Sequence, residues 1–126
     1  MNPKALVVDD ENIIQKLLEA IVLNFGFDVT TAGDGTLAAK ALRSNDFDLV
    51  ITDLEMGTTN GFDVIKLAKS INSNTIVLVA TGCVDERSRR KAIALGASEF
   101  FLKPFSMKDL ENQLNRADFR SKETTQ

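Results

Sequence analysis

The chain has no histidine, no tryptophan and no tyrosine, only one cysteine and only two prolines in 126 residues. Without histidine it lacks the commonest general base, so chemistry that needs an imidazole must take it from a partner. One cysteine excludes an internal disulfide, and a zinc site built from cysteine and histidine is excluded as well. Both absences suit a reducing, cytoplasmic compartment.

Long hydrophobic runs are also missing, since none approaches the roughly 20 residues that cross a bilayer. The first predicted strand begins at Lys4, which leaves no room for a signal peptide, and we expect a cytoplasmic protein with no membrane contact. The net charge of −3 argues against direct nucleic-acid binding, because such domains usually carry clustered positive charge. What is present is 44% hydrophobic residues, enough for one domain with a full core.

Five apolar runs, each followed by a helical pattern, organise the sequence. The strands are predicted at 4–8, 27–32, 49–52, 76–80 and 100–102, and the helices at 11–25, 36–43, 62–70, 84–95 and 106–120. This alternation predicts an α/β fold: a three-layer, doubly wound, five-stranded parallel sheet of the flavodoxin-like (βα)5 type. The second run alternates partly with polar residues, which is typical of an edge strand. We assign 1–120 to the domain and 121–126 to a polar tail.

The helical patterns also predict which side chains face the sheet and where helices begin and end. The predicted inward positions are Ile13, Ile14, Leu17, Leu18, Ile21, Val22 and Phe25 in the first helix, Leu37, Ala38, Ala41 and Leu42 in the second, and Met107, Leu110, Leu114 and Ala117 in the last. Gly96 is expected to end the fourth helix and Ser106 to cap the fifth. Residues 55–61 are rich in turn formers and are predicted to form a functional loop.

Polar side chains stand where four of the five apolar runs stop. Asp9 and Asp10 follow the first run, Asp53 the third, Thr81 the fourth and Lys103 the fifth. In an open parallel sheet the carboxyl ends of all strands face one crevice. These groups meet only if the four strands are contiguous, so we predict the strand order 2-1-3-4-5.

Such a group of side chains is typical of metal-assisted phosphoryl transfer. Asp53 is the candidate carboxylate nucleophile, which would carry the phosphate as an aspartyl-phosphate. One or two carboxylates suffice to hold Mg²⁺, and Asp9 and Asp10 would supply them directly or through water. Alternatively, Asp10 caps the first helix and Asp9 alone binds metal. Lys103 and the hydroxyl of Thr81 would each contact a phosphoryl oxygen.

Over essentially its whole length the chain resembles a receiver domain of the two-component response regulators. The matching features are Asp9-Asp10, Asp53 followed by Met56 and Gly61, Thr81 followed by a small residue, Gly96-Ala97-Ser98, and Lys103-Pro104-Phe105. The resemblance implies that Asp53 accepts phosphate from the phosphohistidine of a sensor histidine kinase or histidine phosphotransfer protein. It also implies that Asp9, Asp10, Asp53 and the backbone carbonyl of Glu55 bind Mg²⁺, while Lys103 contacts the phosphoryl group.

The same resemblance implies a switch and an output. Thr81 and Phe100 correspond to paired switch positions, expected to alter the surface made by the fourth helix, fifth strand and fifth helix. That surface would act on a protein partner or a fused output domain, so the chain is a signalling domain rather than an enzyme. Glu55 and Cys83 resemble variable positions flanking the phosphoryl group and are expected to tune its lifetime. For Glu55 a solvated loop charge is the alternative.

Three other functions would use parts of this pattern. An aspartyl-nucleophile phosphatase would use the same Asp53 and Mg²⁺, but the second aspartate of that family is replaced here by Glu55. A flavodoxin-like cofactor binder would need a phosphate-cradling loop after the first strand, where Asp9, Asp10 and Glu11 would repel phosphate. A phosphorylation-independent scaffold is the third. The short tail favours either a stand-alone receiver or a fragment of a longer regulator, with the kinase, output and oligomeric state left open.

Overall fold

A five-stranded parallel sheet forms the centre of the structure, a computed structural model that describes residues 2–56, 59–82, 85–103 and 106–116. Its strands are β1 (Lys4–Val8), β2 (Asp28–Ala32), β3 (Leu49–Thr52), β6 (Ile76–Thr81) and β7 (Glu99–Leu102). They lie in the order β2-β1-β3-β6-β7. In chain order of these strands this is 2-1-3-4-5, so the predicted topology and the edge position of the second strand are confirmed.

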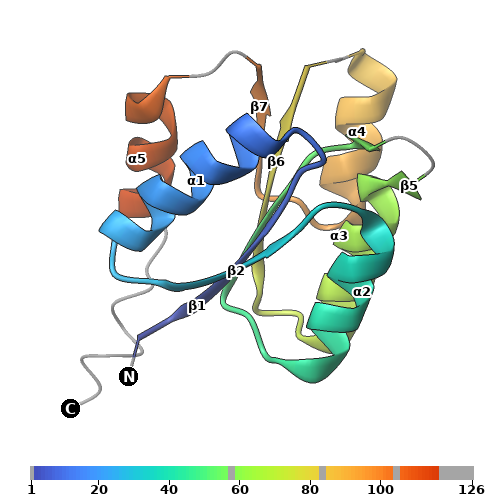
Figure 1. The fold of residues 1–126 in the computed structure, drawn as a ribbon. Helices are drawn as coiled ribbons and strands as arrows, with labels where there is room; N and C mark the ends of the chain where they lie inside the picture. The colour runs from blue at the N-terminus through green and yellow to red at the C-terminus, as the bar shows by residue number, and fades with distance from the viewer. Residues whose placement is uncertain (1, 57–58, 83–84, 104–105, 117–126) are drawn as a thin grey trace.

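Helices cover both faces of the sheet. They are α1 (Asn12–Asn24), α2 (Gly35–Ser44), α3 (Gly61–Ile71), α4 (Glu86–Leu95) and α5 (Met107–Arg116). α1 and α5 lie on one face, and α2, α3 and α4 on the other (Figure 1). The predicted three-layer arrangement is therefore confirmed. None of the helices in the described ranges combines the length and apolar character needed to cross a bilayer.

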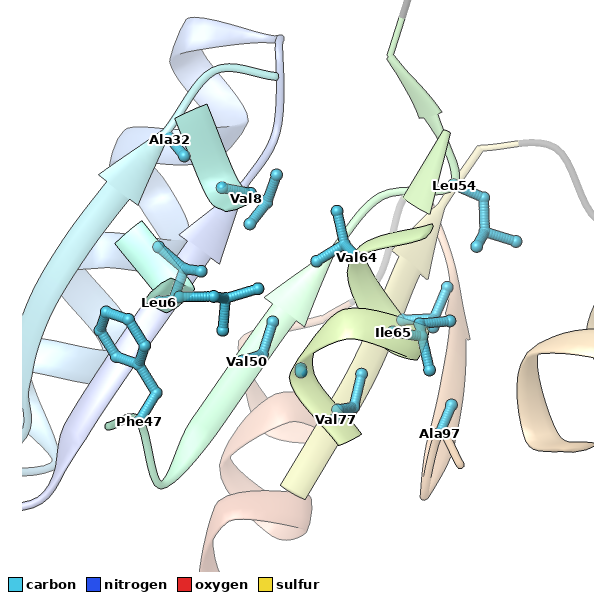
Figure 2. Packing of buried hydrophobic residues seen from close by; sticks show 14 of the residues in the cluster. Leu6, Val8, Ala32, Phe47, Val50, Leu54, Val64, Ile65, Val77 and Ala97 are labelled. Carbon is cyan, nitrogen blue, oxygen red and sulfur yellow. The ribbon is translucent and has the colours of Figure 1, made fainter. Parts of the chain in front are cut away.

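Successive strand side chains alternate between two hydrophobic cores, as the pleat of a β-strand requires. In β1, Leu6 and Val8 belong to the core under α2, α3 and α4, whereas Ala5 and Val7 belong to the core under α1 and α5. Figure 2 shows the first of these cores, where Leu6 and Val8 lie among side chains of the neighbouring strands and α3. Burial on both faces explains why the central strands are continuous apolar runs rather than alternating ones.

The segment predicted as a loop at 55–61 contains a small antiparallel pair instead. β4 (Glu55–Met56) pairs with β5 (Thr59–Asn60). The hydroxyl of Thr59 donates to the carbonyl of Met56 at 3.1 Å and accepts from the amide of Gly35 at 3.0 Å. The segment that follows β3 is thereby fastened to the start of α2.

Two predicted helix ends are confirmed, although several boundaries differ by one or two residues. Gly96 ends α4 with a φ of 118°, a left-handed conformation that glycine adopts without strain. Ser106 Oγ accepts from the amide of Asp109 at 3.0 Å at the start of α5. The predicted start of the fourth helix at Val84, and the predicted end of the domain with its tail at 121–126, lie outside the described residues.

Some predicted inward positions are wrong. Ile13 is 82% exposed and Leu17 42% in α1, and Leu37 and Met107 are exposed in α2 and α5. In α1 the buried residues are Leu18, Ile21 and Val22, and the partly buried Ile14 packs against the same core. The predicted apolar face of the helix is wider than the part of the helix surface that the sheet covers. Periodicity alone does not show which side of this apolar face stays in solvent.

This difference can be tested in α1. Ile13→Ala should change the free energy of unfolding by no more than about 0.5 kcal/mol, as is usual for surface substitutions. Leu18→Ala should lower it by about 2–5 kcal/mol, because Leu18 is 1% exposed and its loss leaves a cavity. Denaturant titration followed by far-ultraviolet circular dichroism is suitable, since the chain has no tryptophan. Equal losses for the two variants would contradict the observed orientation of α1.

Candidate functional site

The carboxyl ends of β1, β3, β6 and β7 bring the predicted polar groups to one edge of the sheet. The backbone ladder continues past the strand ends: the amide of Asp53 donates to the carbonyl of Val8 at 3.0 Å, and the amide of Lys103 donates to that of Thr81 at 2.7 Å. The register of neighbouring strands therefore fixes the backbone positions of Asp53 and Lys103 along the strand direction. Asp9, Asp53 and Thr81 are all buried.

Lys103 is the hub of the side-chain contacts. Its Nζ lies 2.8 Å from Oδ2 of Asp9, 2.9 Å from Oε1 of Glu11 and 3.1 Å from Oδ2 of Asp53. The structure thus brings Lys103 together with Asp9 and Asp53, and its contact with a phosphoryl group stays a prediction. The contact with Glu11 was missed, although a third acidic residue directly after the Asp9-Asp10 pair was a visible signal for it.

Backbone amides hold the other oxygens of the two buried carboxylates. Oδ1 of Asp9 accepts from the amide of Glu11 at 2.9 Å, and Oδ1 of Asp53 accepts from the amide of Glu55 at 3.2 Å. Each carboxylate therefore has one oxygen fixed by the chain and one directed at Lys103. This leaves little rotational freedom, so the carboxylates are held in place before any ligand arrives.

Asp10 is exposed and completes an acidic cluster. The alternative that it caps the first helix is wrong, because the N-cap residue of α1 is Glu11. Carboxylate oxygens of Asp9, Asp10 and Asp53 all lie within 4.8 Å of one another. Hard oxygen donors at this spacing fit a divalent cation. The carbonyl of Glu55 as a further ligand stays a prediction.

Burial and pairing shift two pKa values in the site. Burial raises the pKa of the Asp9 carboxyl above its ordinary value, although hydrogen bonds from Lys103 and Glu11 act in the opposite direction. Burial also acts to lower the pKa of the Lys103 ammonium, but its hydrogen bonds to Asp9, Glu11 and Asp53 outweigh that effect and raise the pKa. Lys103 therefore keeps its positive charge throughout the physiological pH range.

The hydroxyl of Thr81 is buried and has no hydrogen-bond partner within the described ranges. Leaving a buried polar group unpaired costs about 1–3 kcal/mol, so such a group calls for an explanation. It stands at the end of β6, next to the strand that carries Asp53. An anionic ligand bound at Asp53 would supply the missing acceptor.

Of the four predicted switch and tuning positions, the structure describes Thr81, Phe100 and Glu55. Phe100 is half-buried, pairs with Val79 in the sheet and packs against the core under α2, α3 and α4. Glu55 is exposed in β4. Cys83 lies outside the described residues, and the switching role of Thr81 and Phe100 stays a prediction.

Gly61 allows α3 to begin directly against the backbone of Asp53. A Cβ added at Gly61 would lie 2.0 Å from the carbonyl oxygen of Asp53 and 3.0 Å from Cα of Leu54. The amide of Gly61 also donates to the carbonyl of Leu54 at 2.9 Å. No larger residue fits here without moving the backbone that carries the central carboxylate.

The sequence model of the response regulator receiver domain family matches residues 5–115. Among curated relatives, the probable transcriptional regulator ycf27 of Guillardia theta is 34% identical over 97% of this chain and 50% of its own length. The alkaline phosphatase synthesis transcriptional regulatory protein PhoP of Bacillus subtilis is 34% identical over 87% of this chain and 46% of its own length. The chain thus spans about half the length of these relatives.

Solved structures of response regulator proteins have a similar fold. The chemotaxis protein CheY4 of Vibrio cholerae has 29% identity and a TM-score of 0.84, with 92% of this chain and 98% of that chain covered. A response regulator receiver domain protein from Clostridium thermocellum has 32% identity and a TM-score of 0.84, covering 95% of this chain and 97% of its own.

Gly61→Ala tests the close approach to Asp53. The added methyl group must displace backbone, so the free energy of unfolding should fall by about 1–3 kcal/mol, as for other overpacked sites. The matched control is Gly33→Ala, because a Cβ there meets no atom of the described residues within 4 Å. Chemical denaturation of both variants decides the matter, and a Gly61→Ala protein as stable as the control would contradict this packing.

The raised pKa of Asp9 predicts a pH dependence. Between the ordinary value of 3.8 and the raised value, the folded protein binds more protons than the unfolded chain, so stability falls as pH rises through this window. Asp9→Asn removes that fall. The free energy of unfolding of Asp9→Asn minus that of the wild type should therefore increase with pH above about 4. Chemical denaturation in the presence of chelator measures this difference. A difference that decreases over this window would show a lowered pKa instead.

Proposed function

The chain belongs to the response regulator receiver domain family, and we propose that Asp53 is the residue on which it receives the phosphoryl group. As a receiver domain it is a phosphoacceptor of two-component signalling, a signalling role rather than metabolic catalysis. The single observation that favours Asp53 is its central place. β3 lies between β1, which brings Asp9, and β6, which brings the unpaired hydroxyl of Thr81.

The proposed transfer uses groups whose positions are given above. A carboxylate oxygen of Asp53 forms a bond to phosphorus while the bond between phosphorus and the imidazole nitrogen of a donor phosphohistidine breaks, and the electron pair stays on that nitrogen. The proposed donor is a sensor histidine kinase or histidine phosphotransfer protein. The phosphohistidine must come from outside this sequence, which has no histidine. Lys103 neutralises charge on one phosphoryl oxygen, and the Thr81 hydroxyl donates to another.

The acidic cluster fits a divalent cation, and Mg²⁺ is the ion we propose. Asp9, Asp10, Asp53 and the backbone carbonyl of Glu55 would hold it. When bound, it offsets the negative charge of the carboxylates and of the phosphoryl oxygens. Without it, the carboxylates and the incoming phosphoryl anion repel one another, and Lys103 is the one ammonium within hydrogen-bond distance of Asp53 in the described part of the chain.

Output follows from the charge that phosphorylation adds. Thr81 would turn towards the phosphoryl oxygens and Phe100 towards the space that Thr81 leaves, which changes the surface of α4, β7 and α5. That surface would act on a protein partner or on an output domain joined to this one in a longer regulator, with no direct nucleic-acid contact by residues 1–120. Glu55 and Cys83 would tune the phosphoryl lifetime. We place the domain in the cytoplasm.

Acetyl phosphate tests the assignment of Asp53. Incubation with acetyl phosphate and Mg²⁺ should add one phosphate per chain, measured by intact-protein mass spectrometry, whereas Asp53→Asn should add none because an amide is not a nucleophile of this kind. Chelator should suppress the reaction of the wild type. Asp48→Asn, which changes an acidic residue at the opposite end of β3, is the control. Labelling of Asp53→Asn at the wild-type level would overturn the assignment.

A further inference from the structure

Every hydrogen-bond donor of the Lys103 ammonium is already in use. The group has three N–H bonds and no acceptor, and it contacts one oxygen each of Asp9, Glu11 and Asp53, at 2.8, 2.9 and 3.1 Å. A phosphoryl oxygen that binds Lys103 must therefore replace one of these three carboxylates. Which of them leaves is set by the cost of leaving each one unpaired.

The three carboxylates differ sharply in exposure. The side chain of Asp9 is fully buried and that of Asp53 is 6% exposed, whereas that of Glu11 is 61% exposed. Removing the partner of a buried charge is strongly unfavourable, because water cannot replace the lost contact. An exposed carboxylate is rehydrated as soon as it moves away. Glu11 therefore leaves Lys103 at the lowest cost.

The tethering of the three side chains points the same way. The carboxylate oxygens of Asp9 and Asp53 that do not contact Lys103 accept hydrogen bonds from the backbone amides of Glu11 and Glu55, at 2.9 and 3.2 Å. Glu11 is the N-cap residue of α1, but its side chain makes no capping hydrogen bond. Within the described residues, the contact with Lys103 is what holds the Glu11 carboxylate over the site.

We propose that Glu11 is a positioning residue that occupies one donor of Lys103 in the resting domain and gives it up to the phosphoryl group. This inference rests on the proposed role of Asp53. Glu11 then opposes phosphorylation in two ways: its contact with Lys103 stabilises the unphosphorylated state, and its charge repels the incoming anion. The resting ion pair thus sets how readily the site accepts a phosphoryl group.

The test measures binding of beryllofluoride, a phosphoryl mimic, to the whole chain with saturating Mg²⁺ by isothermal titration calorimetry. Glu11→Gln should tighten binding about two- to fivefold, as expected when an exposed ion pair no longer competes. Glu19→Gln is the matched control, with the same loss of charge on α1 at a residue that Lys103 does not contact. It should leave the affinity unchanged.

Equal tightening in both variants would reduce the effect to net charge and overturn the role of Glu11, as would unchanged or weaker binding in Glu11→Gln. A crystal structure of the wild-type complex with Mg²⁺ and beryllofluoride provides the second measurement. Lys103 should contact fluoride, Asp9 and Asp53, with Glu11 turned to solvent. A retained contact between Lys103 and Glu11 would overturn the inference. A wild type that neither binds beryllofluoride nor accepts phosphate would instead refute the proposed function.

Discussion

A single ammonium among several carboxylates is the interaction on which the site depends. Asp9 and Asp53 are buried near each other, so burial and, to a smaller extent, the charge of Asp53 raise the pKa of the Asp9 carboxyl. Lys103 opposes this rise, because it contacts Asp9 as well as Asp53 and Glu11. It comes from a point 94 residues beyond Asp9 and 50 beyond Asp53. The site therefore exists only when the far end of the chain has folded against its beginning.

The sheet makes that meeting possible. β3 lies between β1 and β6, and β7 follows β6, so the residue after each strand emerges at the same edge. Backbone hydrogen bonds extend beyond the strands to the amides of Asp53 and Lys103. These bonds fix the positions of the two residues along the strand direction. Gly61 then lets α3 begin against the carbonyl of Asp53, where any Cβ would collide. The central carboxylate is thus held by neighbours on several sides.

A site held this firmly is also poised for change. The Thr81 hydroxyl is buried without a partner in the described part of the chain, and the Glu11 carboxylate is bound to Lys103 yet mostly in solvent. When an anion binds at Asp53, the Thr81 hydroxyl gains a hydrogen-bond acceptor. The Glu11 carboxylate loses its contact with Lys103 but is rehydrated. The resting structure therefore contains one unsatisfied donor and one replaceable acceptor beside the same carboxylate, which is a suitable starting point for a domain that must respond to phosphate.

The sequence determined the positions of strands and helices, the strand order, and the proximity of Asp9, Asp53, Thr81 and Lys103. Few arrangements of the chain both bury the apolar runs and bring together the polar residues at their ends. Only the tertiary structure decided that Ile13 faces solvent while Leu18 is buried, since the width of a helix face does not reveal which part the sheet covers. The same holds for β4 and β5, and for the contact between Glu11 and Lys103. Such pairings depend on which long side chains reach one another in space, and spacing along the chain carries no record of that.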